Sequence, residues 1–294
     1  MIRRWLATLG LLLVAACQRA PAIAPTPQVA LWAISERSSD RIHGWILGTV
    51  HALPPGTAWR RPAIDAAMDS ADRLVMEIGE PLDPQIAGKA LARVAMTPGL
   101  PPPTARLDSA GRQALLAAYQ QLGLDDARFR DEESWAVALQ ISALASQQAG
   151  ADANDGVEPQ LRARMKGKPV IGLETVDSQF AIFDALSPRS QDRLLAAVAR
   201  EATAHRDSDA QMLTLWLKGD ELGLAREANS DFLADPALHE ALLTARDRAW
   251  TAQLDSLLRS GARPFIAVGA AHVAGRDGLP AMLRARGWTV KRVY

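Results

Sequence analysis

Ile46-Leu47-Gly48-Thr49-Val50-His51 closes a short apolar run, and the same arrangement returns about 220 residues later as Ala267-Val268-Gly269-Ala270-Ala271-His272. Each copy has the pattern of a buried strand that ends at a glycine, with a histidine three residues further on. Because a glycine at a strand end lets the backbone turn sharply, the histidine is expected at the carboxyl end of the strand, where open α/β sheets bind ligands. The chain has five histidines, and two in matched contexts predict one metal or catalytic site built from two halves.

The likeness between the two copies continues beyond the histidines. A loop comes next, followed by a helix start with proline at an early position, at residues 61–68 in the first copy and 279–285 in the second. Each helix leads into a further strand, at 74–78 and 288–293. Two strand–loop–helix–strand units predict a duplicated βαβ core with right-handed crossovers.

Six segments have the composition of strands: Ala30–Ile34, His43–Gly48, Arg73–Ile78, Pro169–Leu173, Pro264–Gly269 and Trp288–Val293. Apart from the first pair, their separations require crossover connections. Residues 81–150 and 187–260 have helical patterns; Asp108 and Gly123, for example, are typical of the start and end of a helix. We therefore expect an α/β fold, with a small mixed sheet from two related βαβ-type halves and large helical insertions, forming a single domain over residues 30–294.

The N-terminus has the form of a secretory signal. Two arginines precede an apolar stretch, Trp5–Ala16, which is too short to span a bilayer as a mature helix. This pattern predicts a signal peptide over residues 1–16.

The signal ends in Val14-Ala15-Ala16-Cys17, which resembles a bacterial lipobox, with cleavage before Cys17 and lipid added to it. Residues 17–29 then form a proline-bearing tether. Gln18, rather than Asp, favours sorting to the outer membrane, facing the periplasm. The alternative is a chance cysteine behind an ordinary signal. Cys17 is the only cysteine, so the chain has no intrachain disulfide and no thiolate metal site.

Composition and motifs exclude several classes of function. The formal net charge is zero and no basic cluster stands out, which argues against nucleic-acid binding. The chain has no G-x-S-x-G elbow, no P-loop and no G-x-G-x-x-G, so neither a serine nucleophile nor nucleotide binding has support. His43, His205 and His239 lie in contexts where surface or hydrogen-bonded histidines are the ordinary case.

Two glutamates are candidates to complete a two-histidine site. Glu77 lies within an apolar strand, where a buried unpaired carboxylate is costly; alternation along the strand also permits a solvent-facing position. Glu174 ends another apolar run, at the edge where His51 is expected; it also suits the N-terminal charge of the helix that comes after it. Metals that accept imidazole and carboxylate ligands include manganese, cobalt, zinc and iron.

Several ordered motifs resemble those of the TraB/GumN family, which includes the TIKI proteins of animals. They are Gly48-Thr49-Val50-His51, Glu77, the run Gly167–Thr175 with Gln179, and Val268-Gly269-Ala270-Ala271-His272 with Gly275 and Gly278. The similarity runs in order from about Leu31 to Val293. The resemblance implies a metal-dependent protease whose paired G-x-x-H histidines and a glutamate form the site, in a fold of two related halves around a sheet.

The chain departs from the family pattern at two places. Where the family usually has Arg-Asn, this chain has Arg246-Asp247, so only Arg246 carries over. Where the family usually has an aspartate after a glycine, this chain has Gly156-Val157-Glu158. Arg246 could stabilise an oxyanion or hold a substrate carboxylate. A surface ion pair is the alternative role for Arg246.

The leading hypothesis is a membrane-anchored periplasmic metal-dependent hydrolase that acts on a peptide or small-molecule substrate. His51, Glu77 and His272 would hold the metal, and Glu174 would take a proton from the metal-bound water or act as a further ligand. The alternative is a lipoprotein that captures a haem or a signalling peptide without turnover. A third possibility is a structural partner in envelope assembly, against which the intact candidate site argues.

Overall fold

The structure is a computed structural model that describes residues 27–37, 39–81, 84–204, 207–227 and 231–293. The predicted signal peptide, Cys17 and most of the predicted tether lie outside these residues. In the described part of the chain, no helix combines the length and apolar composition needed to cross a membrane.

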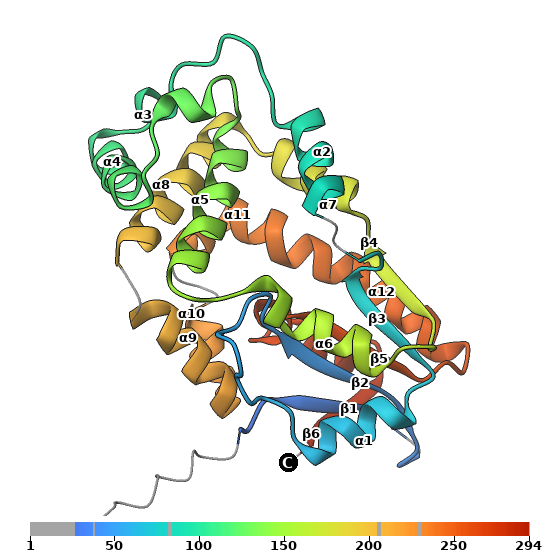
Figure 1. Cartoon of the computed structure of the whole chain (residues 1–294). Coiled ribbons are helices and arrows are strands. Elements are labelled where there is room, and N and C mark those ends of the chain that lie inside the picture. The colour runs from blue at the N-terminus through green and yellow to red at the C-terminus, as the bar shows by residue number, and fades with distance from the viewer. Residues whose placement is uncertain (1–26, 38, 82–83, 205–206, 228–230, 294) are drawn as a thin grey trace, which may run out of the picture.

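One mixed six-stranded sheet organises the molecule (Figure 1). Its strands are β1 (Leu31–Glu36), β2 (Ile42–Thr49), β3 (Arg73–Ile78), β4 (Val170–Glu174), β5 (Pro264–Gly269) and β6 (Trp288–Val293). All six expected strands are present, and their ends agree with the prediction to within two residues. The predicted α/β class with a mixed sheet and helical insertions is confirmed.

The strand order β4-β3-β5-β2-β1-β6 brings the two glycine–histidine motifs together. β2 and β5 are parallel neighbours, with Gly48 opposite Val268 and Thr49 opposite Gly269. β3 pairs with β5 on its other side and β4 pairs with β3, both in parallel. The carboxyl ends of these four strands therefore meet at one edge of the sheet. β1 is antiparallel to both β2 and β6.

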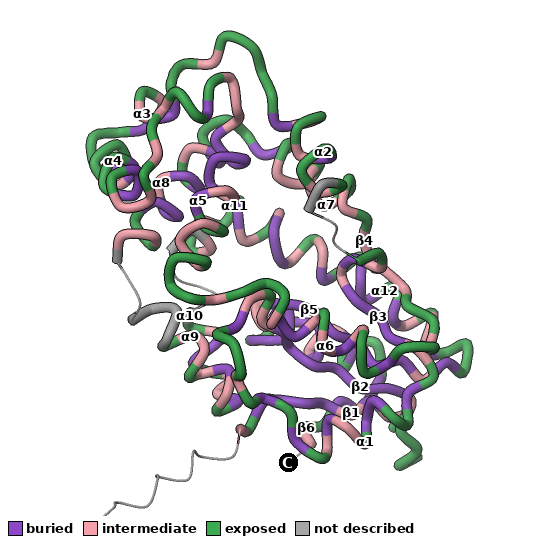
Figure 2. The backbone as a smooth tube through the Cα atoms, viewed as in Figure 1, coloured by how far each residue is buried: buried purple, intermediate pink, exposed green. Residues whose placement is uncertain are grey.

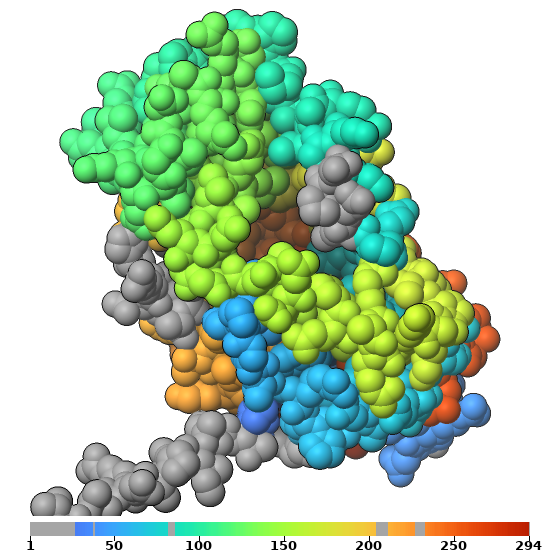
Figure 3. Space-filling model, in the orientation of Figure 1, coloured from blue at the N-terminus to red at the C-terminus, as the bar shows by residue number. Residues whose placement is uncertain are grey.

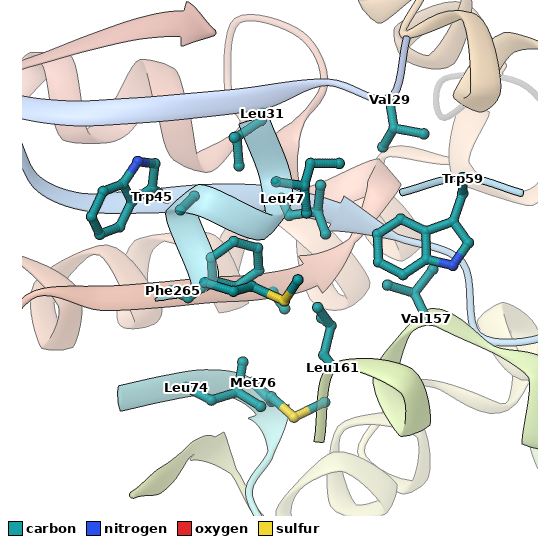
Figure 4. Close-up of a cluster of buried hydrophobic side chains, with 14 of the residues drawn as sticks. Val29, Leu31, Trp45, Leu47, Trp59, Leu74, Met76, Val157, Leu161 and Phe265 are labelled. Carbon is teal, nitrogen blue, oxygen red and sulfur yellow. The ribbon is translucent and has the colours of Figure 1, made fainter. Parts of the chain in front are cut away.

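Each face of the sheet is buried under helices, as strand alternation requires. On one face Leu47, Leu74 and Phe265 pack against α1 (Pro62–Ser70) and α6 (Val157–Arg164) (Figure 4). Trp216 of α9 (Asp207–Lys218) belongs to the same buried cluster. On the other, Ile46, Val75 and Ile266 pack against α12 (Ala245–Arg259) and α13 (Leu279–Ala285). Every fully buried Leu, Ile or Phe of this kind contributes about 1.5–3 kcal/mol to folding.

The helical insertions form a second apolar core beyond the carboxyl edge of the sheet, around Phe129, Trp135 and Leu195 (Figure 2). Their helices are α2 (Pro84–Val94), α3 (Pro103–Arg106), α4 (Ser109–Leu122), α5 (Ser134–Gln148), α7 (Val176–Asp184), α8 (Pro188–Ala204) and α11 (Pro236–His239). Two further helices, α9 (Asp207–Lys218) and α10 (Glu221–Glu227), lie against the sheet. Asp108 caps α4 and Gly123 ends it in the left-handed region, at φ 69°, as their positions in the sequence predict.

A hollow separates the helical insertions from the sheet, and atoms of the orange-brown stretch around α12 are visible at its base (Figure 3). The helix that contains α12 begins among the insertions as α11 and passes through a π-helical turn at Glu240–Thr244 before it reaches the sheet. This helix therefore carries its side chains to the carboxyl edge of the strands.

Candidate functional site

The predicted site residues meet at the carboxyl edge of the sheet. Glu77 Oε1 lies 3.9 Å from His272 Nε2, and Arg246 bridges Glu77 to Glu174 with N–O distances of 2.8 Å to each. His51 faces the same point from β2: a methyl group placed on Gly269 would lie 3.1 Å from Glu77 Oε1 and 3.7 Å from His51 Nε2. Strand register thus brings together side chains that are far apart in the sequence.

Glu77 points toward α12 and not into bulk solvent, since it alternates with Met76 and its side chain is only 12% exposed. Gly269 N–H donates to Oε1 at 2.7 Å, and Gln179 Nε2 donates to Oε2 at 3.2 Å. Burial alone would raise the pKa of Glu77, but its electrostatic interactions with His272, His51 and Arg246 and the Gly269 hydrogen bond lower it to about 2. Glu77 is therefore an ionised carboxylate at neutral pH.

Glu174 lies beside Arg246 at the carboxyl edge of the sheet, and the cap of the next helix is a different residue. Thr175 caps α7 through a reciprocal pair of hydrogen bonds with Ser178. The Glu174 carboxylate accepts from Arg246 Nε at 3.0 Å and Nη2 at 2.8 Å, and from Trp250 Nε1 at 3.0 Å. Three donors on two oxygens fix this carboxylate beside the guanidinium.

Arg246 is the central cation of the site, and its side chain is 11% exposed, which excludes a surface ion pair. Besides its two glutamates it donates from Nη1 to His272 Nε2 at 3.1 Å and to the Leu242 carbonyl at 3.0 Å. Its guanidinium also lies 4.6 Å from the centre of the Trp250 ring. Burial would lower the pKa of Arg246, but Glu174 and Glu77 outweigh it and raise that pKa.

His272 is buried, with a defined partner at each ring nitrogen. Nδ1 lies 2.8 Å from Asp247 Oδ1, and Nε2 faces Arg246, which can only donate. Nε2 must therefore accept and Nδ1–H must donate to Asp247. Burial raises the pKa of Asp247, and the hydrogen bond from His272 offsets this only in part. The Trp250 ring packs over the imidazole at 4.4 Å and completes its enclosure.

His51 lies at the open side of the site, where 70% of its side chain is exposed, with Nδ1 2.7 Å from Glu158 Oε1. Thr49 Oγ1 donates to the same oxygen at 2.5 Å. Although desolvation by the surrounding protein lowers the pKa of His51, the hydrogen bond and charge of Glu158 raise it to about 9. The imidazole is accordingly protonated at neutral pH in the metal-free protein.

Backbone pairing holds Glu158 against His51. Val157 N–H donates to the Val50 carbonyl at 3.1 Å, and Leu53 and Asp152 exchange hydrogen bonds of 3.2 and 3.0 Å. Gly156 permits this approach, because a Cβ there would lie 2.1 Å from the His51 carbonyl oxygen. Backbone hydrogen bonds thus hold the segment before α6 against the loop that carries His51.

Sequence reasoning missed Asp247 and Glu158 as site residues. They stand at the two places where the chain departs from the family pattern. The signal in the sequence was that both of these positions carry a carboxylate. Each occupies Nδ1 of one histidine. A carboxylate on the second ring nitrogen is the usual support of a metal-ligating histidine, since it fixes the tautomer and orients the ring.

The donor types of these residues fit the metal that the family resemblance implies. Their spacing, however, is not that of a complete set of metal ligands. Among the described residues, no three His, Cys, Asp or Glu side chains are already spaced to hold one ion. Two ligands of a tetrahedral zinc lie about 3.4 Å apart, whereas His272 Nε2 and Glu77 Oε1 are 3.9 Å apart. For this pair, about half an ångström of closure, with Arg246 moved aside, would give the ligand spacing of a tetrahedral zinc.

The charges around the site favour a cation. Four carboxylates converge on one guanidinium and two imidazoles: Glu77, Glu158, Glu174 and Asp247. Negative charge is therefore in surplus, which suits a divalent ion better than an anionic ligand.

Comparison with known proteins shows which family the chain belongs to. The profile of the TraB/PrgY/gumN family matches residues 30–292. The uncharacterised protein YbaP of Shigella flexneri and that of Escherichia coli K12 are each 25% identical over 252 residues, which cover 82% of this chain and 88% of each relative. No solved structure matches the chain significantly. Because the family profile spans nearly all of the described residues, the chain belongs to the TraB/PrgY/gumN family.

Proposed function

We propose that the protein is a metal-dependent hydrolase. The observation that carries this proposal is the matched support of the two histidines, in which Glu158 and Asp247 each occupy Nδ1, so that Nε2 is the ring nitrogen that would ligate a metal. Both Nε2 atoms lie on the side of the ionised Glu77. Two oriented imidazoles and a carboxylate are the protein donor set of many catalytic zinc sites.

In this proposal His51, Glu77 and His272 hold one divalent ion, whether manganese, cobalt, zinc or iron. When bound, such an ion lowers the pKa of a coordinated water and polarises a substrate carbonyl. Arg246 stabilises the negative charge that develops on the substrate oxygen. Glu174 orients Arg246 and is the proposed acceptor of the water's proton. Glu158 and Asp247 keep the two imidazoles in the ligating tautomer.

The proposed substrate class is a peptide, by analogy with the protease activity that the family resemblance implies. The hollow over α12 supports access by a chain molecule, because it opens between the helical insertions and the sheet (Figure 3). No nucleic acid is proposed as a partner, since the formal net charge is zero.

The proposed location is the periplasmic side of the outer membrane, with the chain anchored by lipid on Cys17. The support is the lipobox-like Val14-Ala15-Ala16-Cys17 and the position of Val29, whose side chain is fully buried where the predicted tether ends. Mass spectrometry of the mature N-terminus should find diacylglycerol on Cys17, and the Cys17→Ser variant should lose it and leave the membrane fraction. A Cys17 without lipid would contradict the anchor.

Turnover of a peptide library tests the hydrolase itself. The mature chain, purified in detergent and loaded with manganese, cobalt or zinc, should cleave some members of the library, and a chelator should stop the cleavage. The matched control is the His51→Ala variant, which removes the exposed ligand with little loss of packing. Metal-independent cleavage, or equal cleavage by the control, would exclude the proposed mechanism. Stoichiometric ligand capture without cleavage would favour the binding-lipoprotein alternative.

A further inference from the structure

The guanidinium of Arg246 occupies Nε2 of His272, which a metal would need, and also one of the two oxygens of Glu77. Its Nη1 lies 3.1 Å from Nε2 of His272, and its Nη2 lies 2.8 Å from Oε2 of Glu77. Because Nδ1 of His272 is committed to Asp247, Nε2 carries the only lone pair that this imidazole can offer to an ion. One permanently charged side chain therefore blocks the ligating nitrogen of His272 and neutralises a second proposed ligand, Glu77, through its Oε2.

The Arg246 side chain also contacts groups other than His272 and Glu77. Nη1 also donates to the carbonyl of Leu242, at 3.0 Å, inside the π-helical turn. Nε and Nη2 hold both oxygens of Glu174, and the Trp250 ring lies beneath the guanidinium at 4.6 Å. The guanidinium can thus release His272 and Glu77 while it keeps Glu174, the Leu242 carbonyl and the aromatic face.

We propose that Arg246 is an internal cation that competes with the metal: it neutralises the site in the metal-free protein and withdraws onto Glu174 and the Leu242 carbonyl when an ion binds. This inference rests on the proposed metal site. It explains how Glu77 and Glu174, which both pair with Arg246, stay close together without an ion, since a buried carboxylate without a partner is strongly unfavourable. It also places a positive charge beside the reacting centre after the ion has entered.

An internal cation that competes with the metal affects metal affinity in the opposite direction to a residue that supports the ligands. A positive side chain that must be displaced, and that afterwards lies close to a divalent ion, lowers the affinity of the site. Replacing Arg246 by a neutral side chain should therefore tighten metal binding even though it damages turnover. If Arg246 merely supported the site, the same replacement would weaken binding.

The test is the affinity of the mature chain for zinc and cobalt, measured at fixed pH by competition with a chelator. Arg246→Met and Arg246→Gln should each bind at least tenfold more tightly than the wild type. The matched control is Arg248→Met, two residues along α12, whose side chain is 56% exposed and pairs with Glu240. This control should bind as the wild type does. Equal or weaker binding by both Arg246 variants would overturn the inference.

A second measurement uses the wild-type chain and needs no variant to fold. In the zinc-loaded protein, structure determination should find Arg246 Nη1 at the Leu242 carbonyl and no longer at His272 Nε2. Zinc bound at His272 with the Arg246–His272 contact intact would overturn the inference. Failure of the wild type and of all variants to bind any metal would instead refute the proposed function on which the inference rests.

Discussion

At the scale of single residues, His272 shows how the site is specified. Its two ring nitrogens have different partners, Asp247 on Nδ1 and Arg246 on Nε2, so its tautomer is set by the consecutive side chains of one helix. His51 has the same support from Glu158, although that residue comes from a distant part of the chain. In both halves of the site a carboxylate therefore holds Nδ1 of the histidine, although the two carboxylates come from different elements.

Asp247→Asn tests the support of His272. The amide oxygen can still accept from Nδ1–H, so the free energy of unfolding should change by no more than about 1 kcal/mol. Loss of the negative charge makes the imidazole a poorer ligand, and metal affinity should fall about tenfold. Urea unfolding and chelator competition measure the two quantities. An unchanged affinity for metal would mean that the Asp247 carboxylate does not support ligation by His272. The asparagine that the family pattern usually has at this position would agree with that result.

The pKa of His51 predicts the pH dependence of metal binding. Glu158 raises this pKa to about 9, so the folded protein holds a proton on His51 at neutral pH. The stabilisation from that pair is complete below the ordinary histidine value and is lost as the pH rises through 9. A metal needs the neutral ring, so binding at pH 7 should release about one proton from His51, and affinity should rise about tenfold per pH unit toward 9.

Calorimetric titration of metal in buffers of different ionisation heat measures that proton release. Glu158→Gln is the control variant, because it removes the main cause of the raised pKa and should reduce the release at pH 7. A wild type that releases no proton at pH 7 would contradict the assignment of His51 as a ligand.

At the scale of elements, the π-helical turn Glu240–Thr244 is the least regular feature near the site. Ala245 N–H donates to the Glu240 carbonyl, five residues back, and His239 Nδ1 and Thr244 Oγ1 share a hydrogen bond of 3.0 Å over the same interval. Such a turn adds one residue to a helix and so rotates the side chains on its C-terminal side about the helix axis. Here it precedes Arg246 and Asp247 directly, which accounts for both side chains reaching His272.

The pair Thr244→Val and Thr244→Ser tests whether the side-chain hydrogen bond stabilises the π-helical turn. Valine keeps the shape and loses the hydroxyl, so unfolding should become easier by about 1 kcal/mol. Serine keeps the hydroxyl and should stay within about 0.5 kcal/mol of the wild type. Urea unfolding compares the three proteins. Equal losses in both variants would assign the effect to packing and remove the hydrogen bond from the account.

Gly156→Ala tests the backbone contact that holds Glu158 against His51. The backbone at Gly156 is ordinary, at φ −56°, so the expected effect is steric: the new Cβ would meet the His51 carbonyl oxygen. Unfolding should become easier by about 2 kcal/mol, and metal affinity should fall as Glu158 is displaced. Gly88→Ala is the matched control, because a Cβ on this α2 glycine meets nothing and should stabilise the helix by about 0.5–1 kcal/mol. Similar behaviour of the two variants would contradict the steric account.

The elements also show what a sequence can predict. The strands were predictable because each is an apolar run bounded by glycine, proline or charge, as in Pro264–Gly269. The meeting of His51, Glu77 and His272 followed from the rule that parallel strands share a carboxyl edge. Asp247 was missed because the rotation of its helix decides which side chain it meets. Glu158 was missed because backbone pairing brings it to His51 from 107 residues away. Neither leaves a local pattern in the sequence.

At the scale of the whole molecule, the duplicated motif and the chain between its two copies have separate tasks. The pairing of β2 with β5 joins the two halves at the centre of the sheet and brings both histidines to one edge. The chain between the two copies adds Glu158, Glu174 and Arg246 to that edge from α6, β4 and α12. A site of this kind depends on the complete fold, and single-domain behaviour over residues 30–294 stays a prediction.

The most direct test of the central claim, that His51, Glu77 and His272 hold one ion, is the metal stoichiometry of the mature chain. The wild type, dialysed after loading with manganese, cobalt or zinc, should retain one equivalent of at least one of these metals. The His51→Ala, His272→Ala double variant should retain none while its circular dichroism spectrum stays that of the wild type. Retention of one equivalent by the folded double variant, or no retention of any metal by the wild type, would contradict the account.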